Sequence, residues 1–146
     1  MGKEHNYLLY IQLILLILLA YFGDLNRVFS NPLLSIIFSL GLIACALSVM
    51  RLGTKSFSPF PYPSKTNVHA NEGVYKYVRH PLYSGIMLSG LALLLSNLKL
   101  ETFAVLITLG LILNIKADIE EEHLLKRHGD YKTYQTNTKK FIPFVY

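Results

Sequence analysis

Apolar residues gather into four blocks along the chain, and they do not recur at the spacing of a water-soluble core. The blocks cover residues 7–22, 33–50, 82–98 and 100–115. Each block is close to the length of about 20 apolar residues that a helix needs to cross a bilayer. The pattern therefore predicts an all-α integral membrane protein with four transmembrane helices.

A polar stretch separates the second block from the third. Residues 53–80 are rich in Ser, Pro, Asn and Lys, and the alternate prolines at 59, 61 and 63 exclude a helix there. Four spans use about half of the chain, which leaves no room for a separate soluble domain. We expect one domain over residues 1–146, with an N-terminal helical hairpin (1–52), a cytoplasmic loop (53–80) and a C-terminal hairpin with its tail (81–146).

The connections inside both hairpins are short. Residues 24–32 form an outer turn in this interpretation, with Pro32 in the first turn of the next helix. Residues 96–101 allow only a tight turn, so the third and fourth helices must pack antiparallel. Gly85 and Ser89 are spaced for close helix approach, and we expect them to face the fourth helix.

The two ends of the chain differ in character. The first block is almost entirely Leu, Ile and Tyr, so we expect a lipid-facing signal anchor that is retained and does no chemistry. After residue 115 the fourth block continues as a polar pattern up to Gly129. This continuation predicts a cytoplasmic C-terminal helix.

The composition agrees with a membrane protein. Hydrophobic residues make up 52% and charged residues 16% of the chain, and the mean hydropathy is +0.37, which argues against a soluble enzyme. The single cysteine, Cys45, lies inside the second block and gives no basis for a disulfide framework or a cysteine-based zinc site.

The basic residues indicate how the chain is oriented. If all four blocks span, 12 of the 14 Lys and Arg residues lie on one side, and only Arg27 and Lys99 lie on the other. This bias predicts that both termini and the long loop face the cytoplasm, and we expect a prokaryotic plasma membrane. The net charge of +5 thus reflects orientation, and we expect no nucleic-acid partner.

Two polar constellations are candidates for chemistry. Arg79, His80 and Pro81 stand at the start of the third span, where Arg79 contacting lipid phosphates and His80 capping the helix is the simpler interpretation. An acidic run at residues 120–122 lies past the fourth span, and there the simpler interpretation is a solvated helix face. Because a hairpin returns the fourth span to the side where the third begins, the two opposite-charge clusters should meet at one membrane surface.

The same residues carry a resemblance to a known family. Residues 73–85 read Gly-x-Tyr-x-Tyr-Val-Arg-His-Pro-x-Tyr-x-Gly, residues 120–124 read Glu-Glu-x-x-Leu, and Gly129, Tyr131, Tyr134 and Pro143 follow. Together these motifs resemble the isoprenylcysteine carboxyl methyltransferase and phospholipid methyltransferase superfamily. The resemblance covers the C-terminal half of the chain.

The resemblance implies a reaction and a set of site residues. It implies S-adenosylmethionine as the cofactor, bound by the C-terminal hairpin and tail. The acceptor would be lipophilic, an isoprenylcysteine-like carboxylate or a phospholipid amine, reaching the site from the bilayer. The implied cofactor-binding residues are Tyr75, His80, Pro81, Tyr83, Glu120 and Glu121, and the implied catalytic residues are Arg79 and Glu121. A sulfonium cation, a ribose diol and an adenine need acceptors and aromatic surface, which these residue types supply.

Three other functions compete with this one. Glu120 and His123 have the spacing of a di-iron ligand pair, but there is one copy and only five histidines, so we expect no metal. An NADPH-dependent membrane reductase of related fold remains an alternative, although no glycine-rich dinucleotide fingerprint is present. A non-enzymatic adaptor that binds anionic lipid would explain the basic residues but not the acidic run.

Overall fold

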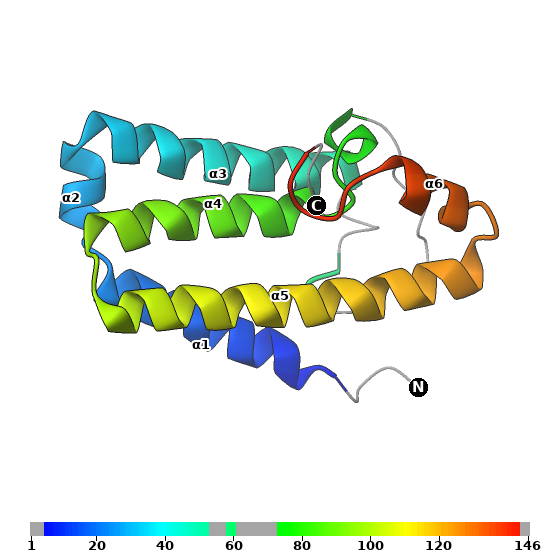
Figure 1. The fold of residues 1–146 in the computed structure, drawn as a ribbon, viewed down its shortest axis with the longest axis horizontal. Coiled ribbons are helices and arrows are strands. Elements are labelled where there is room, and N and C mark those ends of the chain that lie inside the picture. The colour runs from blue at the N-terminus through cyan, green and yellow to red at the C-terminus, as the bar shows by residue number, and fades with distance from the viewer. Residues whose placement is uncertain (1–4, 53–57, 61–72, 144–146) are drawn as a thin grey trace.

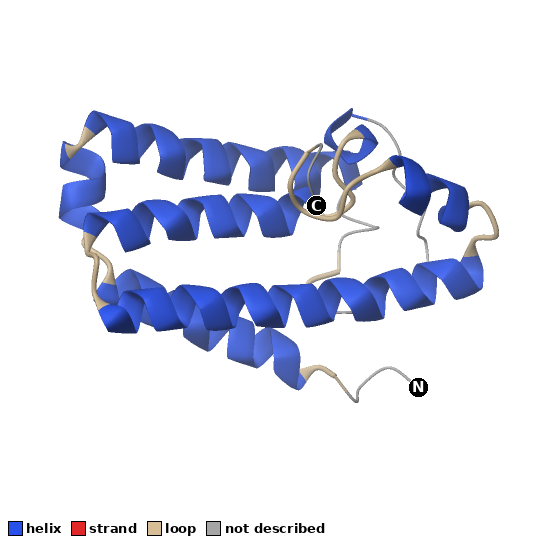
Figure 2. Cartoon of the chain, viewed as in Figure 1, coloured by secondary structure: helices blue, strands red, loops and turns tan. Residues whose placement is uncertain are grey.

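A computed structural model describes residues 5–52, 58–60 and 73–143 (Figure 1). The elements are α1 (Tyr7–Phe22), α2 (Leu25–Ser30), α3 (Pro32–Leu52), the 3-10 helix η1 (Gly73–Lys76), α4 (Pro81–Ser96), α5 (Leu100–Arg127) and α6 (Tyr131–Asn137). Within the described ranges the secondary structure is helical apart from one isolated parallel bridge between Val78 and Lys139 (Figure 2). The predicted all-α class is confirmed, but the prediction of a loop without a helix over residues 53–80 is wrong at η1. Most of that stretch, including Pro61 and Pro63, lies outside the described residues.

The long helices form two packed pairs. Helix α3 lies along α4, and α1 lies along α5, while α4 and α5 form the antiparallel hairpin predicted from their short connection (Figure 1). A core of buried apolar side chains joins the pairs, including Leu19, Val28, Leu109, Leu113 and Ala117. The chain after α5 turns back through α6 toward the start of α4 (Figure 1). This return brings the C-terminal segment to the candidate site.

The stretch predicted as an outer turn contains a helix, so that prediction is wrong in part. Helix α2 begins where the Asp24 carboxylate accepts a hydrogen bond from the Arg27 backbone N–H at 2.9 Å, which is a typical N-cap interaction. Val28 on this helix is fully buried, and its carbonyl accepts a hydrogen bond from the Ser35 hydroxyl at 2.8 Å. The cap and the buried valine together stabilise six residues as a helix. Pro32 opens α3 as expected.

The small residues of α4 face a different helix from the one we predicted. A Cβ atom added to Gly85 would lie 2.6 Å from the Gly41 carbonyl oxygen and 2.7 Å from the Cys45 Sγ, both on α3. The Ser89 hydroxyl donates to the Phe38 carbonyl of α3 at 3.3 Å. The prediction that this face packs against α5 is therefore wrong. Small residues on both α3 and α4 let those two backbones approach most closely, so they meet each other.

Two helices meet the length and hydropathy expected of a membrane span. These are α3 and α5, whereas α1 and α4 are apolar but have 16 residues each. Sixteen helical residues extend about 24 Å, somewhat less than a hydrocarbon core of about 30 Å. Large apolar side chains are exposed along α1, α3 and α5. Helix α5 continues past its apolar part as predicted and ends at Arg127, two residues before the predicted end.

The close approach of α3 and α4 should make Gly85 intolerant of a side chain. We expect G85V to lower the free energy of unfolding by about 1–3 kcal/mol, because the new atoms would push against the α3 backbone. Thermal unfolding in detergent measures the effect. Gly129 is the matched control, since a Cβ there meets no atom within 4 Å. An equal loss of stability in G129V and G85V would contradict this packing argument.

Candidate functional site

The start of α4 is held by main-chain hydrogen bonds to the C-terminal segment. The Arg79 backbone N–H donates to the Lys139 carbonyl at 2.8 Å, and the His80 N–H donates to the Lys140 carbonyl at 3.1 Å. The Lys139 N–H donates in turn to the Tyr77 carbonyl at 3.3 Å. Pro81 then occupies the first position of α4. These bonds fix the backbone from which the Arg79 and His80 side chains extend.

Arg79 joins three chain segments through its guanidinium group. Its Nε donates to Glu121 Oε1 at 2.8 Å. Its Nη1 donates to the carbonyl of Gln135 at 2.9 Å and also to the carbonyl of Thr138. The two side chains of the ion pair are 10% and 7% exposed, so solvent screens this pair little. The guanidinium group thus ties the start of α4 to α5 and to α6.

The Glu121 carboxylate is filled by hydrogen-bond donors. Besides Arg79, a His80 ring nitrogen (Nε2) lies 2.9 Å from Oε1, and the Gln135 side-chain amide donates to Oε2 at 2.6 Å. Glu121 lies beyond Ile115, where the apolar part of α5 ends. Burial opposes its ionisation, but the hydrogen bonds from His80 and Arg79 outweigh burial and lower the pKa of Glu121 to about 2. The group is therefore a carboxylate near neutral pH.

Glu120 has a different environment from its neighbour. Its Oε2 lies 3.5 Å from the Tyr83 hydroxyl and 3.7 Å from His80 Nδ1, and its side chain is 30% exposed. The His80 and Tyr83 rings are stacked, with centroids 5.4 Å apart and planes within 5°. Both carboxylates therefore meet the same imidazole. Glu121 accepts from three donors, whereas the contacts of Glu120 with described residues are 3.5 Å or longer and its side chain keeps a partly exposed edge.

Two tyrosines support the cluster through main-chain carbonyls. Among the described residues, neither forms a hydrogen bond to the two carboxylates. The Tyr134 hydroxyl donates to the Tyr75 carbonyl at 2.6 Å, and the Tyr75 hydroxyl donates to the Ser48 carbonyl of α3 at 3.4 Å. Burial is the main reason that the pKa of Tyr134 is raised to about 12 and that of Tyr75 higher still. Both phenols stay protonated at neutral pH and act as hydrogen-bond donors.

The predicted site residues fall into two groups in the structure. Arg79, His80, Tyr83, Glu120 and Glu121 come together, as expected from the hairpin. Tyr75 and Pro81 are buried beside them and contribute a backbone brace and a helix start. The spatial prediction that the start of α4 meets the polar end of α5 is confirmed. The catalytic or cofactor-binding role of each residue stays a prediction.

Sequence analysis missed four residues around this cluster. The carbonyls of Gln135 and Thr138 accept hydrogen bonds from Arg79, and the Gln135 side-chain amide donates to Glu121. No local sequence pattern distinguishes these two residues. Lys116 is almost fully buried, and its ammonium donates to the Gln12 side-chain oxygen and lies 5.6 Å from the Tyr83 ring centroid. Gln12 is an amide in an otherwise apolar helix, which is a signal of function in membrane helices. The prediction that this helix does no chemistry stays a prediction, but through Gln12 the helix contacts Lys116 beside the cluster.

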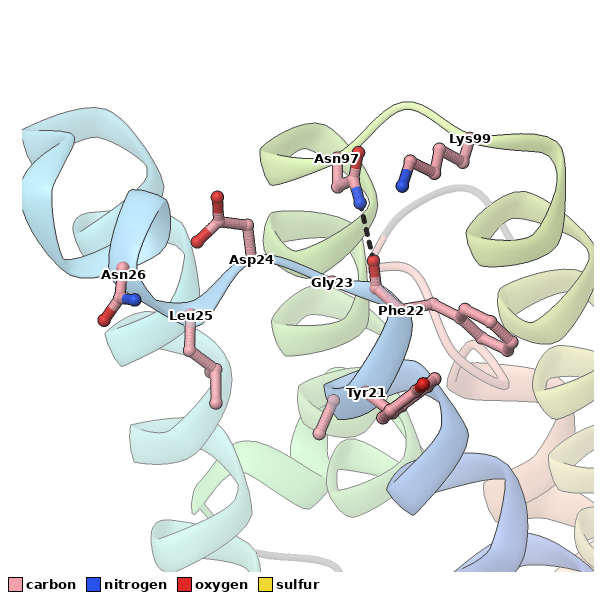
Figure 3. Close-up of a pocket in the computed structure, with 9 residues that line it drawn as sticks. Tyr21, Phe22, Gly23, Asp24, Leu25, Asn26, Asn97 and Lys99 are labelled. Atoms are coloured by element: carbon pink, nitrogen blue, oxygen red, sulfur yellow. Dashed lines mark hydrogen bonds between the residues drawn. The ribbon is translucent and has the colours of Figure 1, made fainter.

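A surface pocket lies at the opposite end of the bundle. Figure 3 shows it between the end of α1, the start of α2 and the turn between α4 and α5. The Asn97 side-chain amide crosses it to donate to the Phe22 carbonyl at 2.8 Å. The whole length of α4 separates this pocket from His80, so it is distinct from the carboxylate cluster. In the part of the chain that the structure describes, no group of three or more His, Cys, Asp or Glu residues is placed to hold a metal ion.

The fold and the cluster together define a class of protein. It is an all-α protein with helices long and apolar enough to cross a membrane, and carboxylate, imidazole and phenol groups gather where α4 begins beside α5. A comparison with known families matches residues 33–131 to the phospholipid methyltransferase family. The match covers more than half of the chain, and the chain belongs to this family. Membership implies methyltransferase activity at a membrane. Searches of curated proteins and of solved structures found no match.

The pH dependence of stability should report the ionised state of Glu121. Its pKa is lower in the folded chain than its ordinary value of 4.5, so its stabilising contribution is complete above about pH 4.5 and is lost as the pH falls toward 2. We expect E121Q to unfold more easily than wild type at pH 7, by on the order of 3 kcal/mol. The gap should close between pH 4.5 and 2.

Thermal unfolding of both proteins across that pH range measures the gap. Glu122 supplies the control, because its ion pair with Lys126 is exposed, and E122Q should unfold at the wild-type temperature. A gap between E121Q and wild type that stays constant from pH 6 to pH 2 would show that ionisation of Glu121 does not stabilise the fold.

Proposed function

We propose that this chain is an S-adenosylmethionine-dependent methyltransferase that acts on a lipophilic acceptor at the membrane surface. One observation carries the proposal: Glu120 keeps a partly exposed carboxylate edge beside His80 and Tyr83, while Glu121 is held by three hydrogen-bond donors. A carboxylate of this kind suits a cationic ligand that also offers hydroxyl groups. Family membership supports the reaction class, and the cluster of ionised and aromatic side chains supports a site at the start of α4.

The residues at the open edge fit the chemical groups of the proposed cofactor. Glu120 offers acceptor oxygens for a ribose diol or an ammonium group. The stacked rings of His80 and Tyr83, with Phe141 at 5.9 Å from the His80 centroid, offer aromatic surface for an adenine. The cofactor supplies an electrophilic methyl group on a positively charged sulfur. A nearby carboxylate favours binding of that positive charge.

Arg79 and Glu121 fit better as positioning residues than as groups that touch the reacting atoms. The Arg79 guanidinium group already donates three hydrogen bonds, to the Glu121 carboxylate and to the carbonyls of Gln135 and Thr138. Glu121 in turn orients the imidazole of His80. We assign His80, Tyr83 and Glu120 to the cofactor, and Tyr75 and Pro81 to the support of the α4 start.

Methyl transfer is a displacement in which the acceptor lone pair forms a new bond to carbon as the carbon–sulfur bond breaks. The protein therefore has little covalent work to do, and holding two reactants in near-attack geometry supplies roughly 7–11 kcal/mol of the barrier in favourable cases. A rigid cluster of ion pairs and stacked rings is suited to this task. We propose a phospholipid amine as the acceptor in line with the family, with an isoprenylcysteine-like carboxylate as the other chemistry that the same geometry would serve.

Binding of the cofactor product should depend on Glu120 and His80. We expect S-adenosylhomocysteine to raise the unfolding temperature of the detergent-solubilised chain, and expect E120Q and H80A to lose at least tenfold in affinity. Glu122 is again the control, because its side chain is exposed and E122Q should bind normally. Transfer of radiolabel from S-adenosylmethionine into a lipid extract would identify the acceptor. No shift at millimolar S-adenosylhomocysteine would contradict the proposal and favour an adaptor or reductase.

We further propose that all four long helices span, with both termini in the cytoplasm. In this arrangement Lys99 and Lys132 lie on opposite sides, and both are exposed. In a C45S background, a membrane-impermeant thiol reagent should label K99C in intact cells but K132C only after permeabilisation. Labelling of both positions in intact cells, or of neither, would contradict four spans in this orientation.

A further inference from the structure

Lys116 is a buried cation with neutral partners. The residue is 1% exposed, and its ammonium donates to the Gln12 side-chain oxygen on α1 and to the Pro59 carbonyl at 3.0 Å. It also lies 5.6 Å from the centroid of the Tyr83 ring, within the range of a cation–π interaction. Among the ion pairs between described residues, none involves Lys116.

Glu120 stands four residues further along the same helix. Side chains at this spacing lie on one face of a helix, although a lysine that precedes a glutamate pairs less readily than the reverse order, in which Glu122 and Lys126 of α5 pair at 2.5 Å. Both Lys116 and Glu120 reach Tyr83, one over its ring and the other toward its hydroxyl at 3.5 Å. Lys116 is 1% exposed and the Glu120 side chain 30% exposed, so water screens the attraction between the two charges only in part.

We propose that Gln12 is a positioning residue that holds the Lys116 ammonium away from Glu120 and so keeps the Glu120 carboxylate open for the cofactor. If Gln12 is removed, the buried ammonium loses an acceptor and turns to Glu120, which approaches the same Tyr83 side chain. The resulting Lys116–Glu120 ion pair would neutralise Glu120 and occupy its oxygens. This inference rests on the proposed function, because it concerns the same carboxylate.

The inference also gives α1 a part in the site. Residues 7–22 lie outside the range that matches the family, and Gln12 is 7% exposed inside an otherwise apolar helix. A buried amide on such a helix is costly unless it is hydrogen-bonded, and Lys116 is its partner. The first helix therefore packs along α5 and also sets the direction of a charge beside the cluster.

The test is a set of near-isosteric variants titrated with S-adenosylhomocysteine by calorimetry on the full chain. Q12M should weaken binding about tenfold, because the ammonium captures Glu120. The double variant Q12M/K116M should bind as well as K116M alone, because the competitor is gone. Q12E should bind as wild type does, because a carboxylate at that position still holds the ammonium. A purely structural role of Gln12 predicts instead that the double variant binds at least as weakly as Q12M.

A second measurement works without any ligand. Thermal unfolding of K116M, E120Q and the K116M/E120Q pair gives the coupling between the two side chains. We expect a weak coupling with Gln12 present, because both side chains reach Tyr83, and a coupling larger by several degrees in the Q12M background, where the ion pair forms. Coupling that is equal in both backgrounds would overturn the inference. If wild type binds no S-adenosylhomocysteine, the proposed function fails, and the coupling alone decides whether Gln12 directs Lys116.

Discussion

The buried carboxylate of Glu121 is the interaction on which the rest of this end of the molecule depends. Its two oxygens are contacted by Arg79, His80 and Gln135, which come from the segment before α4, the α4 start and α6. A buried charge is tolerated only when it is paired and hydrogen-bonded, and leaving one unpaired costs several kcal/mol. Each donor therefore matters for the others. The tail, the helix start and the end of α5 are bound into one unit by a single acceptor.

This arrangement gives two adjacent glutamates different environments. Consecutive residues on a helix point about 100° apart. Glu121 faces the closed side, where three donors meet, whereas Glu120 faces Tyr83 and keeps part of its surface exposed. The saturated carboxylate fixes His80, and His80 then presents its ring and second nitrogen to the open one. In the proposed function, the ionised Glu121 would hold the imidazole in place so that Glu120 stays available to the cofactor.

Much of this arrangement follows from the order of residues along the chain. The apolar blocks located α1, α3, α4 and α5, and the short connection after α4 required a hairpin that brings Arg79 and His80 to Glu120 and Glu121. These features depend on local periodicity and on chain length, which a sequence displays directly. The charge of each cluster then indicated that the two belong together.

The remaining features depend on which faces meet, and a single sequence does not display that. The small residues Gly85 and Ser89 could pack against either neighbouring helix. The structure shows that they face α3, where Gly41 lies opposite Gly85. Asp24 and Val28 turn a predicted loop into α2 through a cap and one buried side chain. Gln135 approaches Glu121 because α6 folds back toward α5. No local sequence pattern predicts that return.

The distribution of polar contacts also suits a chain whose helices pack in lipid. Lipid tails are as apolar as leucine, so burial of apolar side chains does little to drive helix association in a membrane. Close backbone packing and hydrogen bonds between helices stabilise the association instead. At the far end, the Ser96 hydroxyl accepts from the Asp24 N–H at 2.9 Å and the Ser96 carbonyl accepts from Arg27 at 3.2 Å. About one turn into α4, Gly85 lets α3 and α4 touch. At the near end the Glu121 cluster joins α4, α5 and α6, and Gln12 joins α1 to them through Lys116. Hydrogen bonds at both ends of an apolar bundle keep its helices in register. Among the described residues, the end with more of these bonds is the end at which Glu120 lies.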